Sequence, residues 1–256
     1  FFDNCATRIV DKIEEAIGSK IILEPSRKES FRDMVYKYVG TDNWSSLSMS
    51  VCIGYGADRV MTDRERCFVP MELMSAFERA KVVRGGEEQL LCAEKTVVVE
   101  PEYIISFQKE QRLSPIFIFL ILLIFSVVLT IYEYRKGRYF WVYDTLLYTL
   151  VAIAGSILSF LFFFSEHPTT STNLLVIVCN PLVVILALTS AIKSFRNKLV
   201  ADRVIYGTVV AIFILLSWLL PQTIDFAVVL ALTTVLLRTV SSIFINKRIK
   251  TLHHNK

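Results

Sequence analysis

The first nine residues, Phe1 to Ile9, place a cysteine where a helix is expected to begin. Asp3 and Asn4 are favoured helix N-cap residues, because their side-chain oxygens can accept the unpaired N–H groups of a first turn. Apolar residues then recur at helical spacing as far as Ile17, and Gly18 is suited to end the helix. The helix dipole stabilises an anion at this end, so Cys5 is a candidate nucleophilic thiolate. The alternative is a small buried residue that happens to open a helix.

The elements expected to support this helix are short. A second helix is expected at 31–39, opened by Ser30 with Asp33 and ended by Gly40. Residues 47–53 fit a strand, and a helix nearly as well, so this segment stays ambiguous. Pro70 is expected to start a helix over 71–83, followed by a turn at Gly85-Gly86 and a hairpin of strands 90–92 and 96–99. We therefore predict an α+β domain over residues 1–113.

Two further features of this half are more readily structural than chemical. The loop Gly54 to Arg59 has too few glycines to cradle a phosphate, and its Asp58 and Arg59 are expected to make structural hydrogen bonds rather than to bind substrate. No CxxC and no histidine occur in residues 1–114, so a zinc site is not expected. If this half lies outside the cytoplasm, one disulfide among Cys52, Cys67 and Cys92 is possible.

The second half of the chain has the composition of a membrane domain. The net charge is −3 for residues 1–114 and +7 for residues 115–256, and the mean hydropathy of the chain is +0.50. Five apolar spans are expected near 115–132, 142–164, 172–192, 204–220 and 225–245. Lys and Arg occur in alternate connections and in the tail, but not in the connections 165–171 and 221–224. The positive charge therefore indicates how the spans are oriented in the membrane and does not indicate nucleic-acid binding. It predicts a cytoplasmic tail, with residues 1–114 on the opposite side of the membrane.

Several polar residues interrupt these spans. Arg238 lies inside the fifth span, where it can snorkel to the headgroups, face a polar cavity or pair with Asp144. Pro181, with Asn180 before it, predicts a kink in the third span, where Cys179 is expected to be just a small apolar residue. His167, in the outward segment 165–173, is a candidate base or phosphate contact; the alternative is that it shapes the turn at Pro168.

Segments in both halves of the chain resemble one known family. Phe1 to Ile9 resembles the signature of the Lnb family of bacterial lipoprotein N-acyltransferases. The segments 30–33, 54–59 and 69–77 and the five-span membrane domain, residues 114–256, are also similar. The resemblance implies a permuted papain-like domain of the NlpC/P60 type, in which a cysteine at a helix start is paired with a histidine on a strand.

The resemblance implies a specific reaction. An acyl chain passes from a membrane phospholipid through a Cys5 thioester to the N-terminal amine of a diacylglyceryl-cysteine lipoprotein, with no cofactor, no metal and no nucleic acid. Asn4, Arg8 and Asn173 are the candidate substrate-binding residues. The family places its histidine upstream of the cysteine, so we expect this chain to be the C-terminal part of a longer protein, with His167 as the other candidate base. The location implied is the bacterial inner membrane, with residues 1–114 periplasmic.

Two alternatives remain at this point. A membrane-anchored cysteine amidase or peptidase acting on cell wall would use the same thiol, although one span would be enough to anchor it. A non-enzymatic envelope scaffold or transporter subunit would leave Cys5 inert. A phospholipid-derived thioester on Cys5 distinguishes the acyltransferase from both.

Overall fold

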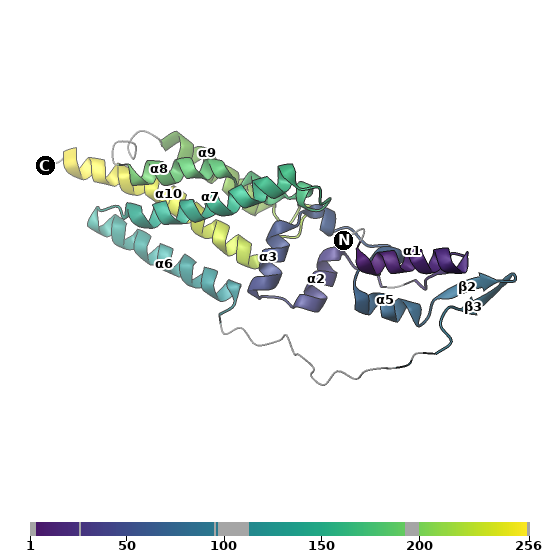
Figure 1. Cartoon of the computed structure of the whole chain (residues 1–256). Coiled ribbons are helices and arrows are strands. Elements are labelled where there is room, and N and C mark those ends of the chain that lie inside the picture. The colour runs from purple at the N-terminus through teal and green to yellow at the C-terminus, as the bar shows by residue number, and fades with distance from the viewer. Residues whose placement is uncertain (1–3, 26, 95, 97–112, 193–199, 255–256) are drawn as a thin grey trace. The chain divides into compact units, whose positions relative to one another are not determined.

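A computed structural model describes residues 4–25, 27–94, 96, 113–192 and 200–254 (Figure 1). The chain forms two compact units. Unit 1 comprises Phe1–Met34 and Arg59–Lys109, and unit 2 comprises Val35–Asp58 and Glu110–Lys256. Residues 35–58 therefore pack with the membrane half, so the two units do not follow the division expected at residue 113.

Unit 1 consists of short helices and one small sheet. The helices are α1 (Cys5–Ile17), the start of α2 (Phe31–Val39), α4 (Asp63–Arg66) and α5 (Pro70–Phe77). The strands β1 (Ile21–Ile22), β2 (Lys81–Arg84) and β3 (Glu87–Leu90) form an antiparallel sheet in the order β1-β2-β3. Ile21 pairs with Val82, and Arg84 pairs with Glu87 across the turn. A papain-like fold for this unit stays a prediction.

The helix predicted over 71–83 is too long. α5 ends at Phe77, and Lys81–Arg84 is a strand in which Val82 is buried and its successors are exposed. The turn at Gly85-Gly86 is present, but it joins β2 to β3 rather than a helix to a strand. Both glycines have positive φ, of 62° and 89°, as the tight turn of a hairpin requires. The hairpin thus lies earlier than predicted; Leu91 and Cys92 follow its second strand, and 97–99 lie outside the described residues.

The helices at 5–17 and 31–39 are confirmed. The ambiguous segment is a helix, α3 (Trp44–Cys52), which Asn43 caps through the Ser46 N–H at 2.8 Å. Its buried residues are Ser46 and Ser50, whereas Met49 is exposed. Because this helix buries small polar residues, the spacing of its apolar residues could not distinguish it from a strand.

Unit 2 is mainly a helical bundle. The helices of the bundle are α6 (Pro115–Lys136), α7 (Trp141–Phe164), the short α8 (Val184–Ala191), α9 (Val200–Leu216) and α10 (Phe226–His254). Among the described residues, four segments are long and apolar enough to cross a membrane, namely Pro115–Lys136, Trp141–Phe164, Leu174–Ala191 and Phe226–Ile249. The remaining predicted span corresponds to α9, whose 17 described residues fall just short of that length.

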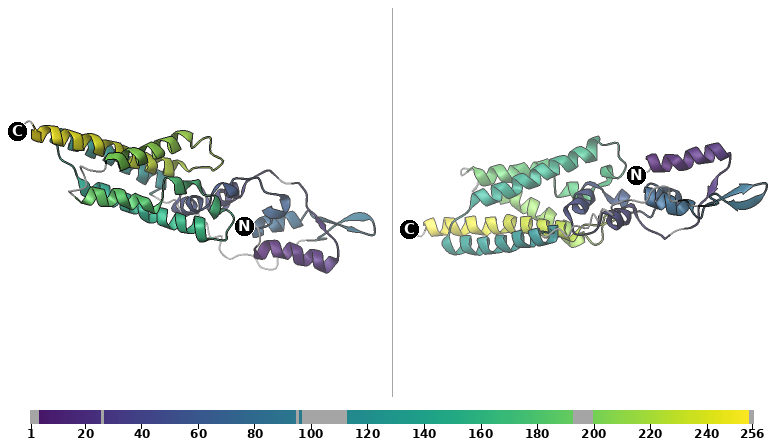
Figure 2. Two further views of the ribbon diagram at one scale, coloured as in Figure 1. Left: turned by 90° about the horizontal axis from the view of Figure 1, so that it is seen from above. Right: turned by 60° about the horizontal axis from the view of Figure 1, so that its bottom comes forward.

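The helices of unit 2 pack in neighbouring pairs. α6 lies beside α10, α7 beside α8, and α9 beside α10 (Figures 1 and 2). The third span is broken, as Pro181 predicts: short 3₁₀ turns η3 (Leu174–Ile177) and η4 (Pro181–Val183) precede α8. Gly155 of α7 packs on this break, where a Cβ atom would lie 2.3 Å from the Asn180 nitrogen. Only glycine allows this approach.

Candidate functional site

Cys5 is the first residue of α1, and it is an exposed free thiol. Asn4 fixes the start of this helix. Its side-chain oxygen accepts the N–H groups of Ala6 and Thr7, each at 3.0 Å, and the Thr7 hydroxyl accepts the Asn4 N–H at 2.9 Å. This reciprocal cap satisfies first-turn donors that have no partner within the helix. The sequence prediction of a capped helix with Cys5 in its first turn is confirmed.

The predicted substrate contacts beside Cys5 have different environments. The Asn4 side-chain nitrogen donates to the Phe68 carbonyl at 2.7 Å, so both polar atoms of that amide bond within unit 1. The Phe68 ring in turn lies 5.5 Å from the Phe31 ring. Asn4 therefore positions the helix start that carries Cys5. Arg8 is exposed on the same helix, and its substrate contact stays a prediction.

The inner face of α1 holds it on the rest of unit 1. Ala6 and Val10 pack in one cluster with Ile21, Cys67 and Leu73. This arrangement follows from the apolar spacing of α1, which places these side chains on one face. The cluster therefore fixes the orientation of the helix that begins at Cys5.

A buried ion pair, which the sequence reasoning missed, supports the same helix. Glu14 is only 7% exposed, and it accepts two hydrogen bonds from Arg64, each at 3.0 Å. It also accepts the Ile21 N–H at 3.0 Å and the Lys20 ammonium at 2.9 Å. Burial opposes ionisation, but the hydrogen bonds from Arg64, Ile21 and Lys20 outweigh it and lower the pKa of Glu14 to about 2. A charged residue on the apolar face of α1 was the available signal.

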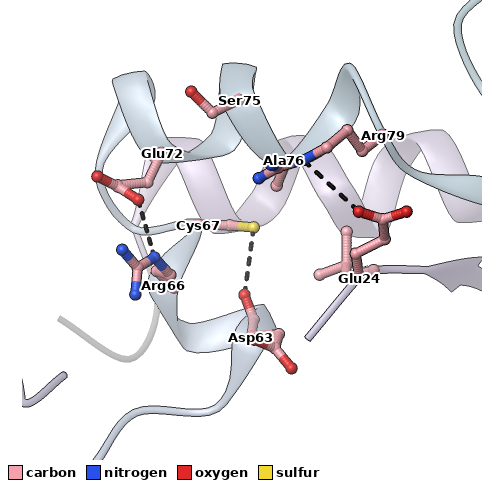
Figure 3. A pocket seen from close by; sticks show the side chains of 9 residues that line it. Glu24, Asp63, Arg66, Cys67, Glu72, Ser75, Ala76 and Arg79 are labelled. Carbon is pink, nitrogen blue, oxygen red and sulfur yellow. Dashed lines mark hydrogen bonds and ion pairs between the residues drawn. The ribbon is translucent and has the colours of Figure 1, made fainter. Parts of the chain in front are cut away.

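A small pocket of unit 1 contains a second cysteine (Figure 3). The Cys67 sulfur lies 3.6 Å from the Asp63 carbonyl, between the ion pairs Arg66–Glu72 and Arg79–Glu24. The pocket encloses about 30 Å³, which is room for water but not for an acyl chain. Burial raises the pKa of Cys67, so this thiol stays neutral. Cys67 is therefore a core residue and Cys5 is the better candidate nucleophile.

All five cysteines are free thiols in the structure, and within unit 1 Cys67 and Cys92 are not joined. Among the described residues, no group of three His, Cys, Asp or Glu side chains is arranged to hold a metal ion.

His167 lies in unit 2, in the segment 165–173, which we call the His167 loop. Its Nδ1 atom lies 2.8 Å from the Thr169 hydroxyl and accepts the Thr169 N–H at 3.4 Å. A backbone N–H can only donate, so in the neutral ring the proton lies on Nε2. Burial lowers the pKa of His167, which favours this neutral form. The geometry favours the loop-shaping role, because the nitrogen that could accept a proton already bonds within the turn.

Asn173 connects the His167 loop to other segments of unit 2. It is buried, and its side-chain nitrogen donates to the Val51 carbonyl at 2.6 Å. Its side-chain oxygen accepts from Leu175 at 3.0 Å and from Gln222 at 3.1 Å. This residue therefore holds the loop in place, and substrate binding by it stays a prediction.

The glycine-rich segment after α3 packs on the same loop. The Gly54 N–H donates to the Thr169 carbonyl at 2.8 Å, and a Cβ atom on Gly54 would lie 2.2 Å from the Thr172 backbone. Asp58 accepts the Thr223 N–H at 3.3 Å, and in unit 1 Arg59 forms an ion pair with Glu65. The structural role expected for Asp58 and Arg59 is thereby confirmed.

A cluster of buried charges lies inside the helical bundle. Arg238 of α10 donates to Asp144 of α7 at 2.6 Å and to Glu133 of α6 at 2.7 Å, and all three side chains are fully buried. Arg238 also donates to the Thr130 hydroxyl at 2.8 Å. Of the three possibilities open for Arg238, the structure has the pair with Asp144. Glu133 was missed because the sequence placed it in a connection, whereas α6 continues to Lys136.

Comparison with known families decides what the helical part is. Residues 107–250, more than half of the chain, match the family model of the Lnb transmembrane domain. The chain belongs to the Lnb transmembrane domain family. No match was found among curated proteins or among solved structures.

The Lnb match covers some of the candidate residues and not others. His167, Asn173 and the Arg238 cluster all lie within the matched residues 107–250, whereas Cys5 does not. The match therefore confirms the resemblance for the membrane domain. The role of Cys5 depends on its own geometry and on the resemblance of residues 1–9.

Proposed function

We propose that the protein is a lipoprotein N-acyltransferase that uses Cys5 to carry an acyl chain. The single observation that carries the proposal is an exposed cysteine at the first residue of a firmly capped helix, in a chain that also contains an Lnb transmembrane domain. A helix N-terminus favours the thiolate form of a cysteine, which is the nucleophilic form. A membrane-bound chain also gives such a thiol access to lipid esters.

In the first half-reaction the Cys5 thiolate attacks the ester carbonyl of a phospholipid. A carbon–sulfur bond forms and the ester carbon–oxygen bond breaks, and the lysophospholipid oxygen leaves with the proton that the Cys5 thiol had given to a base. The product is an acyl thioester on Cys5. In the second half-reaction the amine of a diacylglyceryl-cysteine lipoprotein attacks this thioester. A carbon–nitrogen bond forms, the carbon–sulfur bond breaks, and the amine gives up a proton to a base as the thiolate returns.

The cap on α1 restricts how the oxyanion can be stabilised. The N–H groups of Ala6 and Thr7 bond to the Asn4 side chain, and the Arg8 N–H bonds to the Asn4 carbonyl at 3.0 Å. An oxyanion would therefore be met by the N–H of Cys5 itself and by the positive end of the helix dipole.

A base must take the proton of the attacking amine in the second half-reaction. The family resemblance implies a histidine, and His167 is the candidate within the described residues. Its Nδ1 atom already bonds to Thr169, so it would have to break that turn to act as a base. We therefore infer that His167 orders its loop and that the proton is taken by another group.

The charge pattern supports an orientation in the bacterial inner membrane. The basic ends of α6 and α10 would face the cytoplasm, and the His167 loop and unit 1 the periplasm. Phospholipids would then be the acyl donors and membrane-attached lipoproteins the acceptors.

The proposal is tested by intact-mass analysis of the full chain in detergent after incubation with phosphatidylethanolamine. We expect a mass increase of one acyl group that hydroxylamine removes and that maps to Cys5. Cys5→Ala should abolish the adduct, whereas Cys92→Ala should keep it, because Cys92 is also an exposed thiol of unit 1. Acylation that persists in Cys5→Ala, or that is absent from the unchanged protein, would overturn the proposal. An amidase or a scaffold would give no such adduct.

A further inference from the structure

An apolar groove runs between α6 and α10 in unit 2. Its volume is about 340 Å³, within the range of roughly 300–1,000 Å³ that is usual for ligand clefts. Most of its lining side chains are apolar, and Val240 and Phe244 are 40% and 60% exposed. At the groove, the hydroxyl groups of Thr130 and Ser241 meet at 3.4 Å. The two helices therefore contact each other while leaving an open apolar cleft beside the contact.

The surroundings of the groove indicate what fills it. Both helices are long and apolar enough to cross a membrane, so their uncovered faces lie among lipid acyl chains. The groove is near the end of α6 that carries Arg135 and Lys136, and Arg135 itself lines it. A chain that lies in the groove would therefore have its headgroup at the basic end of the bundle.

The charges at this end of the groove have one sign. The Arg248 guanidinium lies 4.2 Å from the ring of Tyr134, which lines the groove beside Arg135. The nearby carboxylate of Glu133 is buried and already paired with Arg238. The charge at this end of the groove is thus positive, from the exposed Arg135 and the half-buried Arg248, which complements an anionic headgroup.

We propose that this groove binds one anionic phospholipid, with an acyl chain along α6 and α10 and its phosphate between Arg135 and Arg248. Apolar contact supplies affinity for any acyl chain, and the two arginines select the negative headgroup. The site is separate from the chemistry at Cys5, and it stands whether or not Cys5 is acylated.

Native mass spectrometry of the full chain in detergent tests the site, with dioleoylphosphatidylglycerol and dioleoylphosphatidylcholine as probes. We expect one phosphatidylglycerol per chain, bound more tightly than phosphatidylcholine. Val240→Trp should fill the groove and abolish both adducts. Val128→Trp is the matched control, because Val128 is 59% exposed on α6 and does not line the groove.

The headgroup preference has its own control. Arg135→Gln should weaken phosphatidylglycerol binding about five-fold, the effect expected for one interfacial cation, and leave phosphatidylcholine unchanged. Arg138→Gln removes an exposed arginine that does not line the groove and should change neither. Equal binding of both lipids, or unchanged binding to Val240→Trp, would overturn the proposal. A dimer that Val240→Trp dissociates, with no lipid bound, would assign the groove to a second copy of the chain instead.

Discussion

Replacement of Arg238 by methionine removes the shared partner of two buried carboxylates. Glu133 would keep the Phe140 N–H at 2.7 Å, and Asp144 would keep the Tyr139 hydroxyl at 2.7 Å, but neither would keep a cation. Methionine has a similar length and no polar atoms, so packing changes little. The variant therefore isolates the loss of charge compensation.

The loss in the free energy of unfolding can be estimated in two ways. Arg238 donates hydrogen bonds to Asp144, Glu133 and Thr130, and hydrogen bonds inside membrane proteins average about 0.6 kcal/mol, or about 2 kcal/mol together. Removal of one partner of a buried ion pair costs about 3–5 kcal/mol, because an uncompensated charge remains. Two buried carboxylates lose their shared cation here, so we expect the larger value.

The free energy of unfolding can be measured by SDS titration from detergent micelles, followed by circular dichroism. Arg238→Met should lose about 3–5 kcal/mol, and the triple variant Glu133→Gln, Asp144→Asn, Arg238→Met should regain most of it. Arg138→Met, which replaces an exposed arginine just after α6, is the control and should change little. A loss below about 1 kcal/mol, or a triple variant as unstable as the single one, would refute the reasoning.

Three further predictions concern the supports of the site. The pKa of Glu14 is lowered to about 2 from 4.5, so its stabilising effect is present above pH 4.5 and is lost as the pH falls toward 2. Over this pH range the protection of the α1 amides from hydrogen exchange should fall by about 2 kcal/mol, after allowance for the half-exposed Arg64. Glu14→Gln should remove this pH dependence. Gly155→Ala should lower the melting temperature, because its Cβ would meet the Asn180 backbone, whereas Gly207→Ala, with contacts of 3.4 Å and longer, should be tolerated. His167→Ala should retain Cys5 acylation and lose only loop order, and a total loss of turnover with the fold intact would instead make it the base.

Local signals in the sequence predicted the elements that depend on local chemistry. Asn4 and Gly18 bracket α1, Ser30 and Asp33 open α2, and Pro181 breaks the third span, because capping and proline geometry act within a few residues. The Arg238–Asp144 pair was among the alternatives that the sequence offered, since a charge inside an apolar span needs a partner, the headgroups or a polar cavity.

The misses depend on contacts between distant residues. Residues 81–84 continue a helical pattern, yet they form a strand. Strand β1 pairs with one edge of it, and the Gly85-Gly86 turn brings β3 back along the other edge. Glu14 lies on the apolar face of α1, but nothing local in the sequence indicates that its partner is Arg64, fifty positions away. Asn173 resembles a loop residue open to substrate, but Val51 and Gln222 surround it. Pairing of this kind is decided by the tertiary structure and leaves no periodic signal.

The central claim is that Cys5 carries the acyl chain. The most direct measurement is the intact mass of the full chain after incubation with phospholipid, followed by peptide mapping of the adduct. We expect one hydroxylamine-sensitive acyl group on the peptide that contains Cys5, retained in Cys92→Ala and absent from Cys5→Ala. An unmodified Cys5 under conditions in which lipoprotein N-acylation proceeds would contradict it.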